Sequence, residues 1–216
     1  MKGQMQQTPL SISSLIDFAE RFHPDVEIVS RRVEGDLHRS SFGECAQRAR
    51  QAANALDELG IAQGNRVGTL AWNGYRHMEL YYGVSGSGRV LHTINPRLHP
   101  EQVAYIVNHA EDEAVCFDMT FLPIIKGIAA HCPGVKAWIA LCDAEALPSD
   151  TGLSNLISYE AWIGKHSSSY TWPVLDENDA SCLCYTSGTT GNPKGVLYSH
   201  RSTVLHAYAG ALPDAL

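Results

Sequence analysis

A run of glycine, hydroxyl and lysine residues near the end of the sequence has the composition of an anion-binding loop. The run reads Tyr185-Thr-Ser-Gly-Thr-Thr-Gly-Asn-Pro-Lys-Gly195. A phosphate group is bound by inward-pointing backbone amides, hydroxyl donors and a mobile cation, with no bulky side chain in the way. Here the glycines permit close backbone approach, the serine and threonines donate hydroxyls, and the lysine supplies an ammonium. The predicted phosphate ligands are Thr186, Ser187, Gly188, Thr189, Thr190, Gly191 and Lys194.

Two better-known nucleotide loops do not fit this run. A Walker A loop is excluded, because Pro193 stands where that motif needs its second glycine and Gly195 follows the lysine. A dinucleotide fingerprint is rejected for Gly83-Val-Ser-Gly86-Ser-Gly88, whose glycines have the reverse spacing. That segment is expected in a helix packed against its neighbours. For the run at 185–195, a plain glycine-rich turn is the structural alternative to a phosphate site.

Other reactive side chains give weaker signals. None of the ten histidines forms a His-x-x-x-His pair beside a glutamate, so no metal site is predicted. The six cysteines lack metal or disulfide spacing and are expected as free thiols, with Cys182 and Cys184 packed on one strand face. The acidic run Glu111-Asp-Glu113 is expected to be solvated surface at a helix end.

Composition restricts the class of protein. The chain has 216 residues, 44% of them hydrophobic, which is typical of one globular α/β domain or one and a half. A net charge of -7 and the lack of a Lys/Arg cluster argue against a nucleic-acid partner. No N-terminal apolar stretch indicates a signal peptide, and no run of about 18 apolar residues indicates a transmembrane segment. A cytoplasmic protein is therefore expected.

The segments that must position the loop alternate between strand and helix. The predicted strands lie at 27–33, 66–72, 90–93, 114–117, 136–141 and 180–185, and the predicted helices at 15–22, 42–59, 78–84, 100–110, from 123 onward, and 199–212. This alternation predicts an α/β fold with a mostly parallel sheet flanked by helices. Between 143 and 178 the pattern weakens into a polar connection with Trp162 and Trp172 as anchors.

Two helices carry clear sequence signals. Leu15, Phe18, Ala19 and Phe22 recur at helical spacing and predict an amphipathic first helix with these residues on its apolar face. In the second helix, Ser41 and Glu44 form a capping-box pattern and Gly60 stands as a C-terminal cap.

The loop at 185–195 resembles the signature [YW]-T-S-G-T-T-G-x-P-K-G of the acyl-adenylate-forming, or AMP-binding, superfamily. Three further segments look like medium- and long-chain fatty-acid:CoA ligases (acyl-CoA synthetases): Thr69-Leu-Ala-Trp-Asn-Gly-Tyr75, Thr93-Ile-Asn-Pro-Arg97 and Tyr105-Ile-Val-Asn-His-Ala110. The resemblance implies activation of a fatty acid by ATP to acyl-AMP and transfer of the acyl group to CoA, assisted by Mg²⁺. Arg89 departs from the family, which usually has a small residue there, and its guanidinium is expected to face solvent or strain the packing.

The resemblance also implies roles for single residues. Lys194 would be catalytic, and the loop residues would bind the ATP phosphates. His200 resembles a position near the acyl pocket, with an open alternative that it simply starts a helix capped by Ser199.

Residues 1–216 correspond by this resemblance to the N-terminal portion of the AMP-binding large domain. The adenine pocket, the magnesium-holding glutamate and the small lid domain come later in the family, so a fragment that is inactive alone is expected. A homodimer is possible. Two alternatives stay open: an adenylating enzyme for an aryl, amino or short-chain acid, and a truncated non-catalytic binding module.

Overall fold

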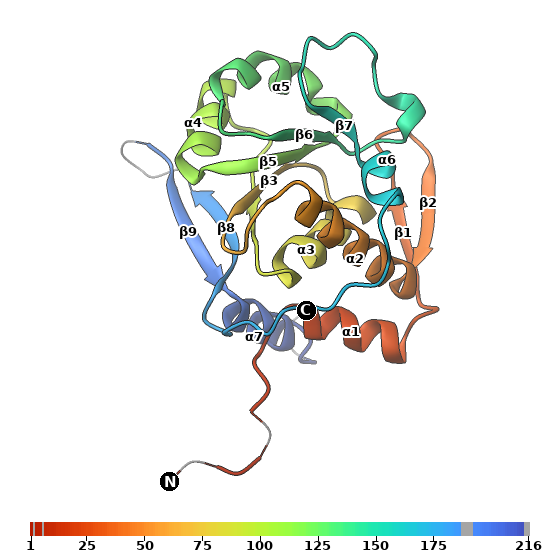
Figure 1. Ribbon diagram of the computed structural model, residues 1–216. Coiled ribbons are helices and arrows are strands. Elements are labelled where there is room, and N and C mark those ends of the chain that lie inside the picture. Colours follow the sequence, from red (N-terminus) through yellow and green to blue (C-terminus); the bar gives the residue numbers. More distant parts are fainter. Residues whose placement is uncertain (2, 6, 187–191, 214–216) are drawn as a thin grey trace.

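The protein is described by a computed structural model, which covers residues 1, 3–5, 7–186 and 192–213. Its described residues form a seven-stranded sheet in the order β7-β6-β5-β3-β4-β8-β9 (Figure 1). Six of these strands run parallel and β9 is antiparallel to β8. The strands are β3 Arg66–Leu70, β4 Val90–Thr93, β5 Asp112–Phe117, β6 Ala137–Ala140, β7 Leu156–Ser158, β8 Ala180–Thr186 and β9 Lys194–Ser199. The predicted α/β fold is confirmed.

Helices cover both faces of the sheet, which places an apolar core on each side. The longer helices are α1 Ser13–Phe22, α2 Phe42–Glu58, α3 Tyr75–Gly86, α4 Pro100–Ala110, α5 Leu122–Ile128, α6 Tyr159–Gly164 and α7 His200–Gly210. Side chains of α2, α3 and α6 pack on one face, and those of α4 and α5 pack on the other. Figure 1 shows α4 and α5 above the sheet and α2 and α3 below it. No helix among the described residues is both long and apolar enough to cross a bilayer.

The second helix begins and ends where its sequence signals lie. The Ser41 hydroxyl accepts a hydrogen bond from the Glu44 amide at 3.2 Å, and the Glu44 carboxylate accepts one from the Ser41 amide at 2.8 Å. Gly60 follows the helix with φ of +66°, a conformation that favours glycine. Gly83 of α3 packs on α2, since an added Cβ would lie 2.7 Å from the Ala49 carbonyl oxygen. Gly83 therefore serves helix packing, as expected, whereas Gly88 lies after the helix with φ of +82°.

Strand β1 Glu27–Arg31 lies within the strand predicted at 27–33, but its partner β2 Leu37–Ser41 and two later elements were not predicted. The two strands pair in a separate two-stranded sheet, and the polar sequence of β2 gave no strand pattern. The predicted connection at 143–178 contains β7 and α6, although Trp162 is buried in it as an anchor.

The predicted apolar face of the first helix is wrong for Phe18 and Phe22 but right for Ala19, which packs against the core cluster around Ile16. Phe18 is 57% exposed and Phe22 is 56% exposed, whereas Ile16 is buried. Ile16 packs against side chains of α2 and α3, and Ser13 is also buried.

Two expectations for charged residues are also wrong. Arg89 is only 3% exposed, and its guanidinium donates at 2.8 Å to both the Ile61 carbonyl and the Ser87 hydroxyl and pairs with Asp57. Asp112 is 2% exposed and its carboxylate lies 2.7 Å from Nδ1 of His92. Both charges are accepted in the interior because they have polar partners there.

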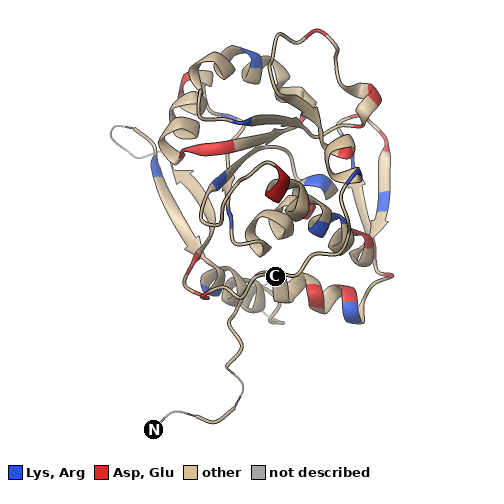
Figure 2. Ribbon diagram, in the orientation of Figure 1, with Lys and Arg blue, Asp and Glu red and all other residues tan. Residues whose placement is uncertain are grey.

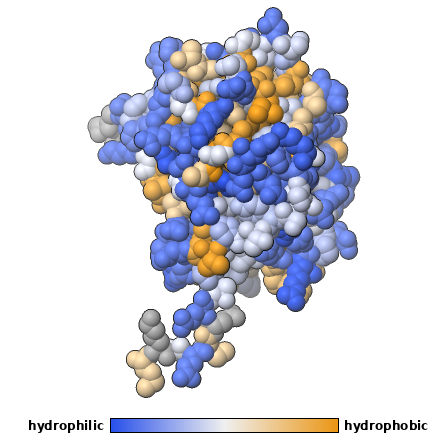
Figure 3. Space-filling model, in the orientation of Figure 1, coloured by the Kyte–Doolittle hydropathy of each residue, from blue (hydrophilic) through white to orange (hydrophobic). Residues whose placement is uncertain are grey.

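The surface carries mixed charge. Acidic and basic side chains intermingle in the view of Figure 2. Figure 3 shows mostly hydrophilic side chains on the same face, with small hydrophobic patches between them.

Candidate functional site

The carboxyl ends of the parallel strands meet along one edge of the sheet. Helix α3 leaves β3 on one face, and α4 leaves the neighbouring β4 on the opposite face. A crevice forms where adjacent strands send their chains to opposite faces, and ligands of open α/β sheets bind there. Strand β8 lies beside β4, so the predicted phosphate loop begins at this edge.

The loop connects the two strands of an antiparallel hairpin. Thr186 pairs in register with Lys194, and Tyr185 pairs with Gly195. Both Thr186 and Lys194 are exposed at the edge of the sheet. The loop was expected to run from 186 to 195. It is shorter than that, because β8 extends to Thr186 and β9 starts at Lys194. The other predicted ligands lie outside the described residues: Ser187, Gly188, Thr189, Thr190 and Gly191.

Gly195 has a packing reason to lack a side chain. A Cβ on this residue would lie 3.1 Å from Leu183 Cδ1 and 3.2 Å from Tyr185 Cζ. The Tyr185 ring thus lies against the opposite strand at the base of the loop. Beside it, a cavity of about 620 Å³ is lined by residues that include Leu183, Tyr185, Gly195, Leu197 and His109.

His200 is fully buried at the start of α7. Its Nδ1 accepts a hydrogen bond from the Ile12 amide at 3.2 Å, and burial lowers the pKa of its imidazole. Ser199 caps the helix, since its hydroxyl accepts from the Ser202 amide at 3.1 Å. This geometry favours the helix-start interpretation, and a contact of His200 with substrate stays a prediction.

Asp118 follows β5 at the same edge of the sheet. Its carboxylate accepts a hydrogen bond from the Trp72 amide at 2.6 Å, which fixes the chain after β3. Burial raises the pKa of Asp118 from 3.8 to about 6, and the Trp72 hydrogen bond only partly opposes this shift.

The raised pKa of Asp118 predicts a pH-dependent stability. A carboxyl whose pKa is higher in the folded state contributes stability that is fully present below its unfolded pKa and is lost as pH rises through the folded value. We expect Asp118→Asn, which keeps the acceptor for Trp72, to remove this loss. Relative to the variant, the parent's free energy of unfolding should fall between pH 4 and 7 by about 2 to 3 kcal/mol. Urea unfolding at a series of pH values measures the difference, and parallel curves for the two proteins would contradict it.

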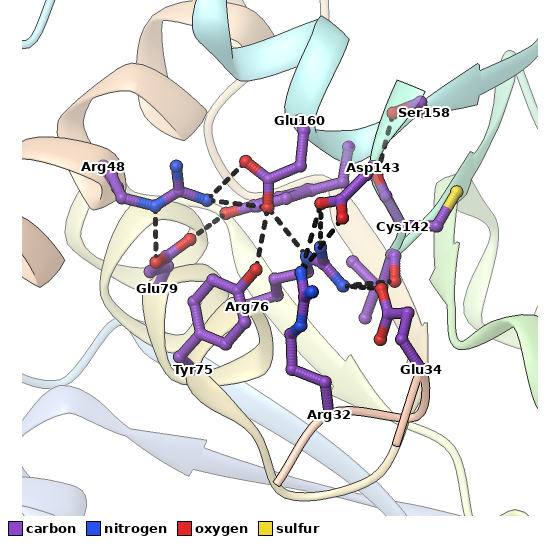
Figure 4. Close-up of polar contacts among 12 residues, drawn as sticks. Arg32, Glu34, Arg48, Tyr75, Arg76, Glu79, Cys142, Asp143, Ser158 and Glu160 are labelled. Carbon is purple, nitrogen blue, oxygen red and sulfur yellow. Dashed lines mark hydrogen bonds and ion pairs between the residues drawn. The ribbon is translucent and has the colours of Figure 1, made fainter. Parts of the chain in front are cut away.

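A network of buried charges lies at the other end of this edge (Figure 4). The Arg76 guanidinium is its centre: it donates to Glu160 and Asp143 at 2.7 Å, to Glu34 at 2.8 Å and to the Leu141 carbonyl at 2.9 Å. These partners come from α6, the chain after β6 and the β1–β2 turn. The network therefore connects the two-stranded sheet of β1 and β2 to the seven-stranded sheet.

Arg48 of α2 extends the network into the core. It donates to Glu79 at 2.7 Å and to Glu160 at 2.9 Å, and Glu79 also accepts from the Tyr159 hydroxyl at 2.9 Å. Burial raises the pKa of Glu79 to about 7 although Arg48 opposes the shift. Burial would also raise the pKa of Glu160, but Arg48 and Arg76 together hold it below its usual value. Sequence spacing gave no signal for this network, because its members lie on separate elements.

Breaking the network should strongly destabilise the fold. Arg76→Met removes the shared partner of three carboxylates from a side chain that is 6% exposed. Loss of one partner from a buried pair costs about 3 to 5 kcal/mol. Arg39→Met is the matched control, since its pair with Glu27 is more than half exposed and should contribute less than about 1 kcal/mol. Urea unfolding of both variants tests this, and equal losses would contradict a structural role for the network.

Known proteins are similar to this chain over its whole length. The sequence matches the AMP-binding enzyme family over residues 17–214. It is 51% identical over 216 residues to a medium-chain-fatty-acid–CoA ligase of Ectopseudomonas oleovorans, covering 100% of this chain and 39% of the relative. It is 49% identical to a 3-methylmercaptopropionyl-CoA ligase of Ruegeria pomeroyi, covering 100% of this chain and 40% of the relative. A long-chain-fatty-acid–CoA ligase of Thermus thermophilus is 38% identical over 97% of this chain and 37% of its own length.

Solved structures share the fold. A crystal structure of the anthranilate CoA ligase AuaEII with anthranoyl-AMP superposes with a TM-score of 0.84 at 22% identity, over 97% of this chain and 38% of that chain. The N-terminal domain of FACL13 from Mycobacterium tuberculosis superposes with a TM-score of 0.78 at 24% identity, over 96% of this chain and 48% of that one. The chain thus spans about two-fifths of the length of the curated relatives it matches. On the family match over most of its length, the chain belongs to the AMP-binding enzyme family.

Proposed function

We propose that this chain forms the ATP-phosphate-binding part of a fatty-acid:CoA ligase. The observation that carries the proposal is the pair formed by Thr186 and Lys194 at the base of the hairpin loop, on the carboxyl edge of the sheet. A hydroxyl and an ammonium on two paired residues at an exposed loop base are donors that a phosphate chain requires. The identity of 51% to a medium-chain-fatty-acid–CoA ligase supports the class of reaction.

In the proposed reaction, the main task of this loop is to stabilise the negative charge that develops on the phosphates. The fatty-acid carboxylate attacks the α-phosphorus of ATP, the bond to the β-phosphate oxygen breaks, and pyrophosphate leaves with the negative charge. The CoA thiolate then attacks the acyl carbonyl and AMP leaves. Donors that are already in place where the charge develops lower the barrier of the first step. Lys194 and Thr186 would act there, with the loop amides and hydroxyls between them.

Mg²⁺ and CoA belong to the proposal by family. Mg²⁺ would neutralise phosphate charge when bound with the nucleotide. Among residues 1, 3–5, 7–186 and 192–213, no group of three or more His, Cys, Asp or Glu side chains is placed to hold a metal.

The proposed acid is a fatty acid. A largely apolar cavity of about 450 Å³ between α1, α3 and α7, lined by Leu15, Met78, Tyr81 and Tyr82 among others, is within the usual range for a small-molecule site. A short acid is the second candidate, because relatives at 49% and 50% identity are 3-methylmercaptopropionyl-CoA ligases.

Acid-dependent formation of acyl-CoA decides between these acids. The assay uses a completed enzyme, in which this chain replaces the matching N-terminal part of the Ectopseudomonas oleovorans ligase. We expect fatty acids to give the highest kcat/KM, above 3-methylmercaptopropionate, benzoate and amino acids. Turnover with an aryl or amino acid alone would contradict the fatty-acid assignment.

Location and assembly are part of the same proposal. All six cysteines are free, which supports a reducing compartment such as the cytoplasm. A homodimer is supported by the exposed side chains of β9, namely Val196, Leu197 and Tyr198.

A further inference from the structure

Tyr185, the first residue of the signature run, contacts both the opposite strand and a distant helix. Across the hairpin it faces Gly195. Its hydroxyl lies 2.6 Å from Nδ1 of His109 in the last turn of α4. The two rings meet edge to face, with centroids 5.8 Å apart and an interplanar angle of 86°. The base of the loop is thereby connected to α4.

Beneath Tyr185 the sheet carries a buried polar pair. The His92 ring lies 5.1 Å from the Tyr185 ring between centroids, and its Nδ1 lies 2.7 Å from the Asp112 carboxylate. The strands of His92 and Asp112 are separated by β3, and the contact crosses β3 at Gly68. A Cβ on Gly68 would lie 2.9 Å from the Asp112 oxygen. The surface on which Tyr185 rests is therefore fixed by a specific contact across three strands.

We propose that His109 is a positioning residue for the ATP phosphates, acting through the Tyr185 hydroxyl. This inference rests on the proposed function of the loop. Thr186 follows Tyr185 directly, and Lys194 precedes Gly195 directly. The tilt of the Tyr185 ring against Gly195 therefore sets the spacing of β8 and β9 at the positions of the Thr186 hydroxyl and the Lys194 ammonium. Without the hydrogen bond to His109, the ring is held only by packing, and Gly195 offers no side chain to stop its tilt.

Steady-state kinetics of ATP–pyrophosphate exchange in the completed enzyme tests the role. His109→Ala should lower kcat/KM for ATP about tenfold, since a displacement of 1 Å can reduce a rate up to a hundredfold. The KM for the fatty acid should change less than about twofold, because the acid does not meet this loop base. His109→Asn, whose side-chain oxygen can take the place of Nδ1 as acceptor, should restore most of the loss. His131→Ala is the control, as this histidine is exposed in the short turn that follows α5.

The Tyr185→Phe variant shows whether the two residues act together. It should reproduce the defect of His109→Ala, and the double variant should be no worse than either single one, because both changes remove the same contact. Three outcomes would each overturn the role of His109. They are a double variant whose defect is the product of the two single defects, a His109→Asn variant as impaired as His109→Ala, and a His109→Ala variant with unchanged kcat/KM for ATP. If the parent enzyme exchanges no pyrophosphate, the proposed function is contradicted, and this inference fails with it.

Hydrogen exchange of the 216-residue chain gives a readout without catalysis. His109→Ala should speed amide exchange in β8 and β9 at least about threefold while β5 and β6 keep the parent rates, because only the hairpin loses its connection to α4. Equal exchange in β8 and β9 of the variant and the parent would overturn the proposal, and so would faster exchange in all strands, which reports general destabilisation.

Discussion

The 216-residue chain alone should form no acyl-CoA when it is incubated with ATP, Mg²⁺, CoA and a fatty acid. In the proposed site, the paired residues Thr186 and Lys194 would form only one wall of a crevice at the carboxyl edge of the sheet. Phosphate contacts alone do not orient the carboxylate for in-line attack, and a lack of orientation removes about 7 to 11 kcal/mol of rate advantage, or five to eight orders of magnitude. The relatives that catalyse such reactions are about two and a half times as long as this chain.

The isolated chain should also self-associate. Strand β9 is at the edge of the sheet and exposes Val196, Leu197 and Tyr198, and an exposed edge strand invites pairing with another chain. Chromatographic detection of acyl-CoA and AMP tests turnover, with light scattering to report assembly. The completed enzyme at equal concentration is the positive control. Sustained formation of both products by the isolated chain would show that the rest of the relatives' length is dispensable for turnover.

Lys194→Ala in the completed enzyme should lower the rate of adenylation by about a hundred- to a thousandfold, the range for removing one donor that stabilises transition-state charge. The reason is that Lys194 lies at the exposed start of β9, opposite Thr186, where the proposed function would place the leaving pyrophosphate. The KM for the fatty acid should stay within about twofold of the parent value, because the ammonium meets phosphate and not the acyl chain. Single-turnover formation of acyl-AMP measures the rate without interference from product release.

Two further variants show whether the effect depends on a positive charge at position 194 or only on the net charge of the protein. Lys126→Ala removes an exposed lysine on α5, outside the hairpin, and should leave the rate unchanged. Lys194→Arg keeps the positive charge but changes its shape and reach, so it should retain an intermediate rate. Parent-like adenylation by Lys194→Ala would remove this residue from the site.

The sequence predicted the parallel sheet well because its elements have strong local signals. The strand at 90–93 and the helix at 100–110 have the predicted bounds, since an apolar run and an initial proline mark them. Ser41, Glu44 and Gly60 act as caps for the same local reason. The phosphate-binding role of the run at 185–195 was predicted from its residue types alone, and it stays a prediction because residues 187–191 lie outside the described part of the chain.

Features that depend on long-range partners were not predictable. Strand β9 reads as part of a loop until β8 supplies its hydrogen bonds, and Asp112 reads as surface until His92 lies across β3 from it. Arg89 was expected to face solvent or strain the packing, yet it is buried because Ile61, Ser87 and Asp57 supply acceptors. Periodicity reports which positions are apolar, and it contains no information on which distant groups will neutralise a buried charge.

The most direct test of the central claim is a crystal structure of the completed enzyme with bound ATP. The hydroxyl of Thr186 and the ammonium of Lys194 should each lie within about 2.7 to 3.2 Å of a phosphate oxygen, at the carboxyl edge beside β4. The Tyr185 hydroxyl should keep its contact with His109 in that complex. ATP phosphates bound elsewhere on the protein, with both of these side chains turned to solvent, would contradict the assignment of this hairpin as the phosphate-binding loop.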